Sequence, residues 1–288
     1  MNFISRFALT CLLGASIAPN LAAADSLSEL AQRTHYHGIA FARSGTSTLL
    51  LATHHGVFAV DKNGNATQAS IVQDYMGFSA TPTDPLTYFA SGHPQTGGNS
   101  GFLKSVDGGA TWNKISDGVS GPVDFHQMDV SLADPHTIYG GYGRLQVSHD
   151  DGQTWAKAGP LPNQIISIAA SGQSVERIYA ATQAGLLISA DGGGSWKPLA
   201  FAAEVVSMVR TGPKGELYAF VLGKGLLRAD EKDPANWKPL SNNFGEAIPL
   251  HMAINSANNA WLALTTQDNA VLESHDAGAS WKPYGTQP

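Results

Sequence analysis

An octapeptide recurs along the chain at nearly even intervals, and this repeat constrains the fold more than any other feature. It reads SVDGGATW at 105–112, SHDDGQTW at 148–155, SADGGGSW at 189–196 and SHDAGASW at 274–281, with a degenerate copy, RADEKDPANW, at 228–237. The tryptophans that end these copies are 43, 41, 41 and 44 residues apart. A period of this length, with four short strands in each unit, is typical of a β-propeller blade.

A sixth unit precedes these five. The segment GVFAVDKNGNATQAS at 56–70 has the same strand–turn–strand pattern but lacks the tryptophan. We therefore expect an all-β chain that folds as a six-bladed β-propeller, with the octapeptide as the turn between the third and fourth strands of most blades. The predicted blades span approximately 35–70, 74–116, 124–158, 164–199, 204–240 and 248–285, and residues 25–34 form an N-terminal arm.

The octapeptides resemble the Asp-box of BNR-repeat propellers, whose pattern is Ser/Thr-x-Asp-x-Gly-x-Thr/Ser-Trp. The chain is also similar to small exported bacterial propellers that are labelled glycosyl hydrolases or sialidase-like. The resemblance implies a propeller fold, but it leaves the function open, because Asp-box propellers include sialidases, sortilin-type receptors and photosystem assembly factors.

The aspartates of the repeat are expected to be structural rather than catalytic. A carboxylate in a tight turn accepts backbone N–H groups, glycine supplies a positive φ, and the tryptophan packs beneath the turn. The residues with this predicted role are Asp107, Asp150, Asp191 and Asp276, with Asp230 in the degenerate copy.

The first 24 residues have the pattern of a secretory signal peptide. A basic start is followed by the short apolar stretch FALTCLLGASIA and by small residues that favour cleavage near Ala24. The one cysteine, Cys11, lies within this segment, so a hydrophobic core must hold the mature domain, residues 25–288, without disulfides. We expect a periplasmic or secreted monomer. Its net charge of −6 and its lack of a second long apolar stretch disfavour nucleic acid and a membrane span as partners.

Stacking the predicted innermost strands of the blades isolates one face of the ring. These strands read HYHGIAF, DYMGFSA, DFHQMDV, QIISIAA, EVVSMVR and IPLHMAI. The fifth column is apolar core: Ile39, Phe78, Met128, Ile168, Met208 and Met252. The third column changes character around the ring: His37, Met76, His126, Ile166, Val206 and Leu250. The first column begins with His35, Asp74 and Asp124.

The loops between the second and third strands return to the same face. Histidines occur only in the first two of these loops, as His54, His55 and His93, with His55 and His93 in matching positions. Six of the ten histidines should therefore converge with Met76 at the channel mouth of blades 1–3. His251, in blade 6, is displaced by one position and is expected to point differently.

This convergence predicts a transition-metal site. Imidazole is the commonest protein metal ligand, and the thioether of Met76 favours copper, with zinc as the alternative. The predicted ligands are His35, His37, His54, His55, Met76, His93 and His126. His54 and His55 point in alternate directions, so one of them should coordinate directly. Asp74 and Asp124 are expected to orient the rings, and the role would be metal storage, delivery or resistance.

Two other classes of function stay open. Asp74 and Asp124 could serve a glycosyl hydrolase as acid and base, or the propeller could be a scaffold for a periplasmic protein partner. A sialidase is disfavoured because its clustered arginines are not apparent among Arg33, Arg43, Arg144, Arg177, Arg210 and Arg228. The sequence therefore leans away from an enzyme.

Overall fold

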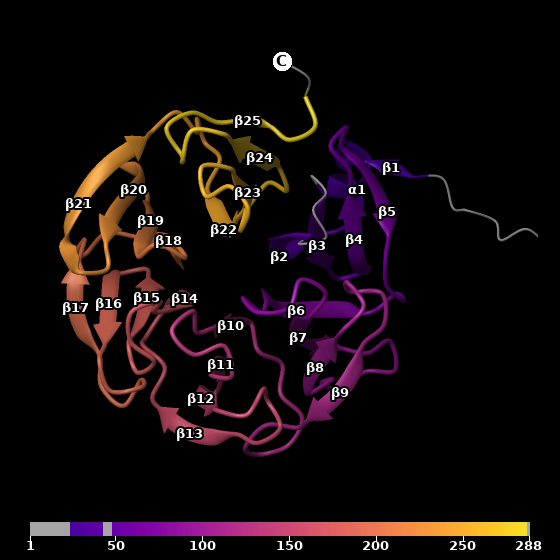
Figure 1. Cartoon of the computed structure of the whole chain (residues 1–288), viewed down its shortest axis with the longest axis horizontal. Helices are drawn as coiled ribbons and strands as arrows, with labels where there is room; N and C mark the ends of the chain where they lie inside the picture. Colours follow the sequence, from indigo (N-terminus) through magenta and orange to yellow (C-terminus); the bar gives the residue numbers. More distant parts are fainter. Residues whose placement is uncertain (1–23, 43–47, 287–288) are drawn as a thin grey trace, which may run out of the picture.

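The computed structural model describes residues 24–42 and 48–286, and within them the chain forms a six-bladed β-propeller (Figure 1). The six blades follow one another around a central channel, and the first strand of each blade lies nearest to it. The predicted fold class is thus confirmed. The predicted signal peptide lies outside the described residues except for its last position, Ala24.

Each blade is an antiparallel sheet of consecutive strands. Blade 1 contains β2 (Tyr36–Phe41), β3 (Leu49–Thr53), β4 (Gly56–Val60) and β5 (Asn65–Gln68). Blade 2 contains β6 (Asp74–Ala80), β7 (Tyr88–His93), β8 (Phe102–Ser105) and β9 (Asn113–Ser116). Blade 3 contains β10 (Gln127–Val130), β11 (Ile138–Tyr142), β12 (Arg144–Ser148) and β13 (Ala156–Gly159).

The other three blades repeat this order. Blade 4 contains β14 (Ile165–Ala170), β15 (Ile178–Thr182), β16 (Gly185–Ser189) and β17 (Lys197–Ala200). Blade 5 contains β18 (Val206–Thr211), β19 (Glu216–Val221), β20 (Gly225–Asp230) and β21 (Asp233–Ser241). Blade 6 contains β22 (Pro249–Ile254), β23 (Leu262–Thr266), β24 (Val271–Ser274) and β25 (Lys282–Pro283).

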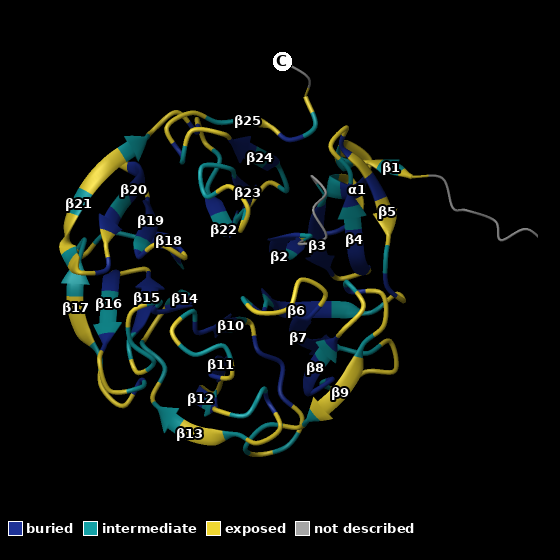
Figure 2. Cartoon of the chain, viewed as in Figure 1, coloured by how far each residue is buried: buried dark blue, intermediate teal, exposed yellow. Residues whose placement is uncertain are grey.

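The core lies between the blades. Six apolar clusters fill the six interfaces, and the cluster that joins blades 1 and 6 packs Phe41 and Leu51 with Ala263 and Tyr284. Burial therefore decreases outwards, from buried inner strands to exposed outer ones such as β9 and β21 (Figure 2). Because apolar burial is the main stabilising term in folding, this packing closes the ring without a disulfide.

The N-terminal arm contains a short helix that the strand patterns do not predict. The two-residue strand β1 (Asp25–Ser26) pairs with β5, and α1 (Leu27–Arg33) follows it. Ser26 and Glu29 form a capping box, in which the Ser26 hydroxyl accepts the Glu29 N–H at 3.2 Å and the Glu29 carboxylate accepts the Ser26 N–H at 2.7 Å. The buried Leu30 fixes the arm to the core of blade 1.

The octapeptides form the turns between the third and fourth strands. In blade 3, Thr154 donates to Asp150 through its backbone N–H at 2.9 Å and through its hydroxyl at 2.6 Å. The same bonds recur at Asp107, Asp191 and Asp276. These bonds lower the pKa of each carboxyl, chiefly through the Thr or Ser hydroxyl. The tryptophans pack between blades, as Trp155 does against Phe102 and Phe125.

Most inner strands carry an extra residue near their start. The pairing shifts around His37 in blade 1, Ile166 in blade 4, Ser207 in blade 5 and Leu250 in blade 6. Ser207, rather than Val206, therefore matches His37, and the predicted alignment of blade 5 is wrong by one position. The bulge occurs at the matching position in all four strands, so it does not cause this difference. The letters of blade 5 were aligned one residue too early because the sequence does not show which residues pair.

The described residues contain no helix that is both long and apolar enough to cross a membrane.

Candidate metal centre

His37 lies at the start of β2, where the strand enters the channel. Its ring is largely shielded from solvent, with 16% of the side chain exposed. Burial lowers the pKa of His37 to about 3, and four neighbouring histidines act in the same direction, namely His54, His251, His126 and His35. The ring is therefore neutral across the physiological range, and its lone pair can bind a metal ion.

The turn between β3 and β4 brings His54 to His37. Thr53 holds this turn, because its hydroxyl donates to the Gly56 carbonyl at 2.9 Å and accepts the His55 N–H at 2.9 Å. The Nε2 atoms of His37 and His54 are 3.1 Å apart. His35 lies beside them, with its ring centroid 6.0 Å from that of His54.

Asp74, at the start of β6, completes a compact group. Its Oδ2 lies 3.2 Å from His54 Nδ1, and its Oδ1 lies 3.8 Å from His37 Nε2. His37, His54 and Asp74 can each offer one ligand atom within 4.8 Å of the others. Asp74 Oδ1 is buried and has no hydrogen-bond partner. Because an unpaired buried carboxylate oxygen is costly, this atom is the best candidate in the group for a metal ligand.

A second histidine group lies on blades 2 and 3. Asp124 Oδ2 is 2.7 Å from His126 Nε2 and 3.1 Å from His93 Nε2, so one carboxylate joins the two rings. The hydrogen bond to Asp124 raises the pKa of His126. Asp124 Oδ1 is buried and unpaired, as Asp74 Oδ1 is. His126 therefore holds a proton more firmly than His37 does, and a proton competes with a metal ion for the same lone pair.

The strand pairing corrects one alignment of the sequence. Tyr36 pairs with Thr53, and the equivalent Tyr75 pairs with Gly92. His93 therefore matches His54, and the expected match between His93 and His55 is wrong. His55 instead lines a separate pocket on the outside of blade 1 with Arg33, Thr34 and Val72. Of the adjacent pair, His54 is the residue that reaches the candidate centre.

Met76 is buried, with 6% exposed, and is not among the residues that line the channel cavity. Its neighbours Gly77 and Phe78 do line it. Gly77 has a φ of +55°, and a Cβ there would lie 2.3 Å from the Phe125 carbonyl oxygen. Glycine thus allows β6 to pass close to blade 3 at this point. Apart from Met76, all the predicted ligands are histidines, which offer nitrogen donors.

His251, which is displaced by one position from the histidine column, lines the channel cavity with His37, and its ring hydrogen-bonds the Tyr36 backbone. A second feature of the channel escaped the sequence analysis. Arg210 and Asp129 form an ion pair at 2.7 Å inside the channel. In the corrected alignment they share one column, in which the other four blades carry only Ala40, Ser79, Ala169 and Ala253. Two opposite charges in an otherwise small-residue column are the signal that could have revealed the pair.

Glu204, the first residue of the segment EVVSMVR, lies outside these two histidine groups. Glu204 pairs with Lys224 at 2.8 Å on blade 5. Among the arginines of the described residues, only Arg210 lines the channel cavities, and Arg43 lies outside the described residues.

No protein-family model matches the sequence, and a search of curated proteins finds no match. Solved structures show the same fold at low sequence identity. The GH74 xyloglucanase from Xanthomonas campestris matches at 18% identity with a TM-score of 0.59, over 91% of this chain and 46% of that protein. This chain therefore spans less than half of the xyloglucanase.

Two further structures match over most of their own length. One is YCF48 bound to D1 peptide, at 16% identity and a TM-score of 0.53, covering 88% of this chain and 84% of that one. The other is the gluconolactonase XC5397 from Xanthomonas campestris, at 12% identity and a TM-score of 0.61, covering 82% and 84%. At these identities the likeness extends to the propeller fold alone.

Proposed function

We propose that this protein binds a divalent transition-metal ion at the channel mouth through His37, His54 and Asp74. The distance of 3.1 Å between His37 Nε2 and His54 Nε2 carries the proposal. Two nitrogens bound to one tetrahedral ion at the usual bond lengths lie about 3.3 Å apart. The two rings thus already have nearly the spacing that a shared ion requires.

The surrounding groups prepare these ligands. Asp74 Oδ2 lies 3.2 Å from His54 Nδ1, and the other ring nitrogen of His54, Nε2, faces His37. Burial keeps His37 neutral. Asp74 Oδ1 supplies a negative charge that offsets part of the charge of a cation. A tetrahedral ion with these three ligands has one position left for His35, for water or for a molecule that receives the metal.

The donor set favours divalent copper, with zinc as the weaker competitor. Imidazole and carboxylate suit both ions, and at a given site Cu²⁺ binds more tightly than Zn²⁺. The sequence argument for copper used Met76, whereas this argument does not need a thioether. We assign the protein to storage, delivery or detoxification of metal in the periplasm, where a signal peptide would direct it.

The experiment is a metal titration of the mature protein and of two variants. His37→Ala should abolish sub-micromolar Cu²⁺ binding, whereas His126→Ala, in the second histidine group, should leave the first ion bound. Equal Cu²⁺ affinity in the wild type and in His37→Ala would show that His37 is not a ligand and would contradict the proposed ligand set.

A glycosidase is the second candidate, supported by the unpaired oxygens of Asp74 and Asp124. Two carboxylates at one channel mouth could act as acid and base. This alternative predicts sugar release from a glycan in the presence of EDTA, and loss of that activity in Asp74→Asn or Asp124→Asn. A scaffold role, the third class, predicts a protein partner whose binding neither substitution changes.

A further inference from the structure

A second cavity lies at the opposite end of the channel from the histidines. It has a volume of about 110 Å³ and is lined by the later parts of the inner strands and by the residues that follow them. The histidine cavity is lined by the earlier parts of the same strands. Both cavities include Ile39, Phe78, Ser79 and Arg210, so they meet at the level of Arg210.

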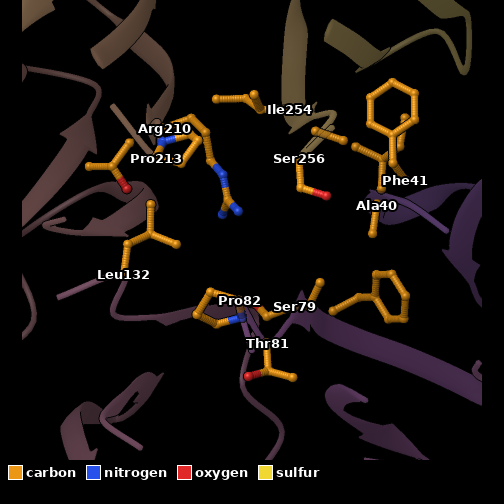
Figure 3. A pocket seen from close by; sticks show the side chains of 15 residues that line it. Ala40, Phe41, Ser79, Thr81, Pro82, Leu132, Arg210, Pro213, Ile254 and Ser256 are labelled. Atoms are coloured by element: carbon orange, nitrogen blue, oxygen red, sulfur yellow. The ribbon is translucent and has the colours of Figure 1, made fainter. Parts of the chain in front are cut away.

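Arg210 is held in place from one side. Its Nη1 donates to Asp129 Oδ1 at 2.7 Å, and Asp129 Oδ2 accepts the Ala170 N–H at 2.9 Å. Asp129 is buried, with 2% exposed, so the guanidinium is tied to a fixed point of blades 3 and 4. The side chain extends into the cavity (Figure 3). Its position is therefore set before any ligand arrives, which lowers the cost of binding one.

Part of the guanidinium is left without a partner. Among the described residues, only Asp129 pairs with Arg210, and Arg210 Nε is buried without any hydrogen bond. Nε itself is covered by the protein, so a ligand in the cavity would reach the terminal nitrogens of the guanidinium. A guanidinium binds a carboxylate through a fork of charge-assisted N–H bonds, so this fixed cation is suited to an anionic ligand.

The rest of the cavity is largely apolar, and the hydroxyl residues Ser79, Thr81, Thr211 and Ser256 also line it. Arg210 is the one charged residue that lines it, and its walls include Phe41, Phe78, Leu132 and Ile254. Ser79 faces it but already donates its hydroxyl to the Met128 carbonyl at 3.1 Å. A cavity with apolar walls and a single fixed cation fits a molecule that has one carboxylate and one apolar end.

We propose that this cavity binds a small aliphatic monocarboxylate, with the carboxylate on Arg210 and the chain against Phe41, Phe78 and Ile254. At roughly 10–15 Å³ for each water-sized occupant, the cavity has room for about eight non-hydrogen atoms. Butyrate, with six, fits this limit. The site uses none of the proposed metal ligands and is independent of the metal function.

The test follows the amide resonances of the ¹⁵N-labelled mature protein during a titration with sodium butyrate, against butyramide and sodium chloride as controls. Butyrate should shift the amides of Ala170 and Thr211, beside Arg210, in a saturable manner. Butyramide has the same shape without the charge and should bind at least tenfold more weakly.

Two variants distinguish a loss of the binding site from a loss of the folded structure. Arg210→Lys keeps a cation for Asp129 but removes the forked edge, and it should weaken butyrate binding at least tenfold. Leu132→Trp fills the cavity without touching the ion pair, and it should block binding while the spectrum remains that of a folded propeller. His37→Ala should bind butyrate as the wild type does. Absence of saturable shifts in the wild type at 50 mM butyrate, or wild-type affinity for butyrate in either cavity variant, would overturn the proposal.

Discussion

His37 Nε2 and His54 Nε2 lie 3.1 Å apart at the mouth of the propeller channel, although the two residues are 17 positions apart in the chain. The pairing of β2 with β3 places them together, because Tyr36 lies opposite Thr53 and each histidine follows one of these residues. The proposed function depends on this pair more than on the number of histidines at the mouth.

Substitution of the adjacent residues His54 and His55 should have opposite outcomes. His54→Ala removes a ligand and should lower Cu²⁺ affinity at least 100-fold. His55→Ala should leave the affinity within about twofold, because His55 lies in a pocket on the outside of blade 1. Competition with a chromophoric chelator measures both. Equal losses of Cu²⁺ affinity in the two variants would show that binding depends on the conformation of the turn and not on the His54 ring.

The two carboxylates of the mouth should also differ. Asp74→Asn removes the negative charge 3.2 Å from His54 Nδ1 and the unpaired carboxylate oxygen Oδ1, so the affinity for Cu²⁺ should fall about 10- to 100-fold. Asp124→Asn affects only the second histidine group and is the matched control. The same titration measures both variants, and a larger loss in Asp124→Asn would move the centre to His93 and His126.

Acid should destabilise the metal-free protein through His251. Burial lowers the pKa of His251 to about 4 in the folded protein, whereas the unfolded chain has an ordinary histidine pKa near 6.5. The unfolded state thus binds the proton first. The contribution of His251 to the free energy of unfolding is therefore fully present above pH 6.5. It falls as the pH drops towards 4, by up to about 1.4 kcal/mol per pH unit.

Urea unfolding between pH 7 and pH 4.5 measures this dependence. His251→Gln should reduce the slope of the free energy of unfolding against pH. His149→Gln, at an exposed position in an octapeptide turn, is the matched control. Identical slopes in the wild type and in His251→Gln would contradict the assignment.

The octapeptide turns should contribute stability without affecting the metal. Asp150 accepts two bonds from Thr154 and one from Ser148, so Asp150→Ala should lower the free energy of unfolding by about 1–2 kcal/mol. Calorimetry would show this as a Tm lowered by several degrees. Cu²⁺ affinity should not change, because the turn lies at the other face. An unchanged Tm would contradict the predicted structural role of Asp150.

The fold could be predicted from the sequence because the repeat determines both where the blades lie and how their strands are connected. Tryptophan spacing located the blades, and the Asp–Gly turns fixed the order of the strands. His37, His54 and Asp74 were all among the predicted residues of the mouth. What the sequence could not supply was the division of that mouth into two groups, each organised by its own aspartate, since this depends on side-chain directions.

The alignment errors share one origin: the sequence alone does not show which residues pair across neighbouring strands. The alignment of β18 by sequence letters alone placed Val206 where Ser207 belongs, because it lacked the strand pairing, and this hid the column that contains Asp129 and Arg210. The match of His55 with His93 failed in the same way, because the two loops were aligned from their first residues rather than by their strand partners. Met76 was assigned to the mouth by position alone, without the close approach of Gly77 to blade 3.

The central claim is tested most directly by equilibrium dialysis of the metal-free mature protein against buffered Cu²⁺, with elemental analysis of the bound metal. We predict one Cu²⁺ per chain at sub-micromolar free concentration, and its loss in the double variant His37→Ala/His54→Ala while the folded spectrum is retained. The absence of sub-micromolar binding in the wild type, or one Cu²⁺ still bound by the double variant, would contradict the account.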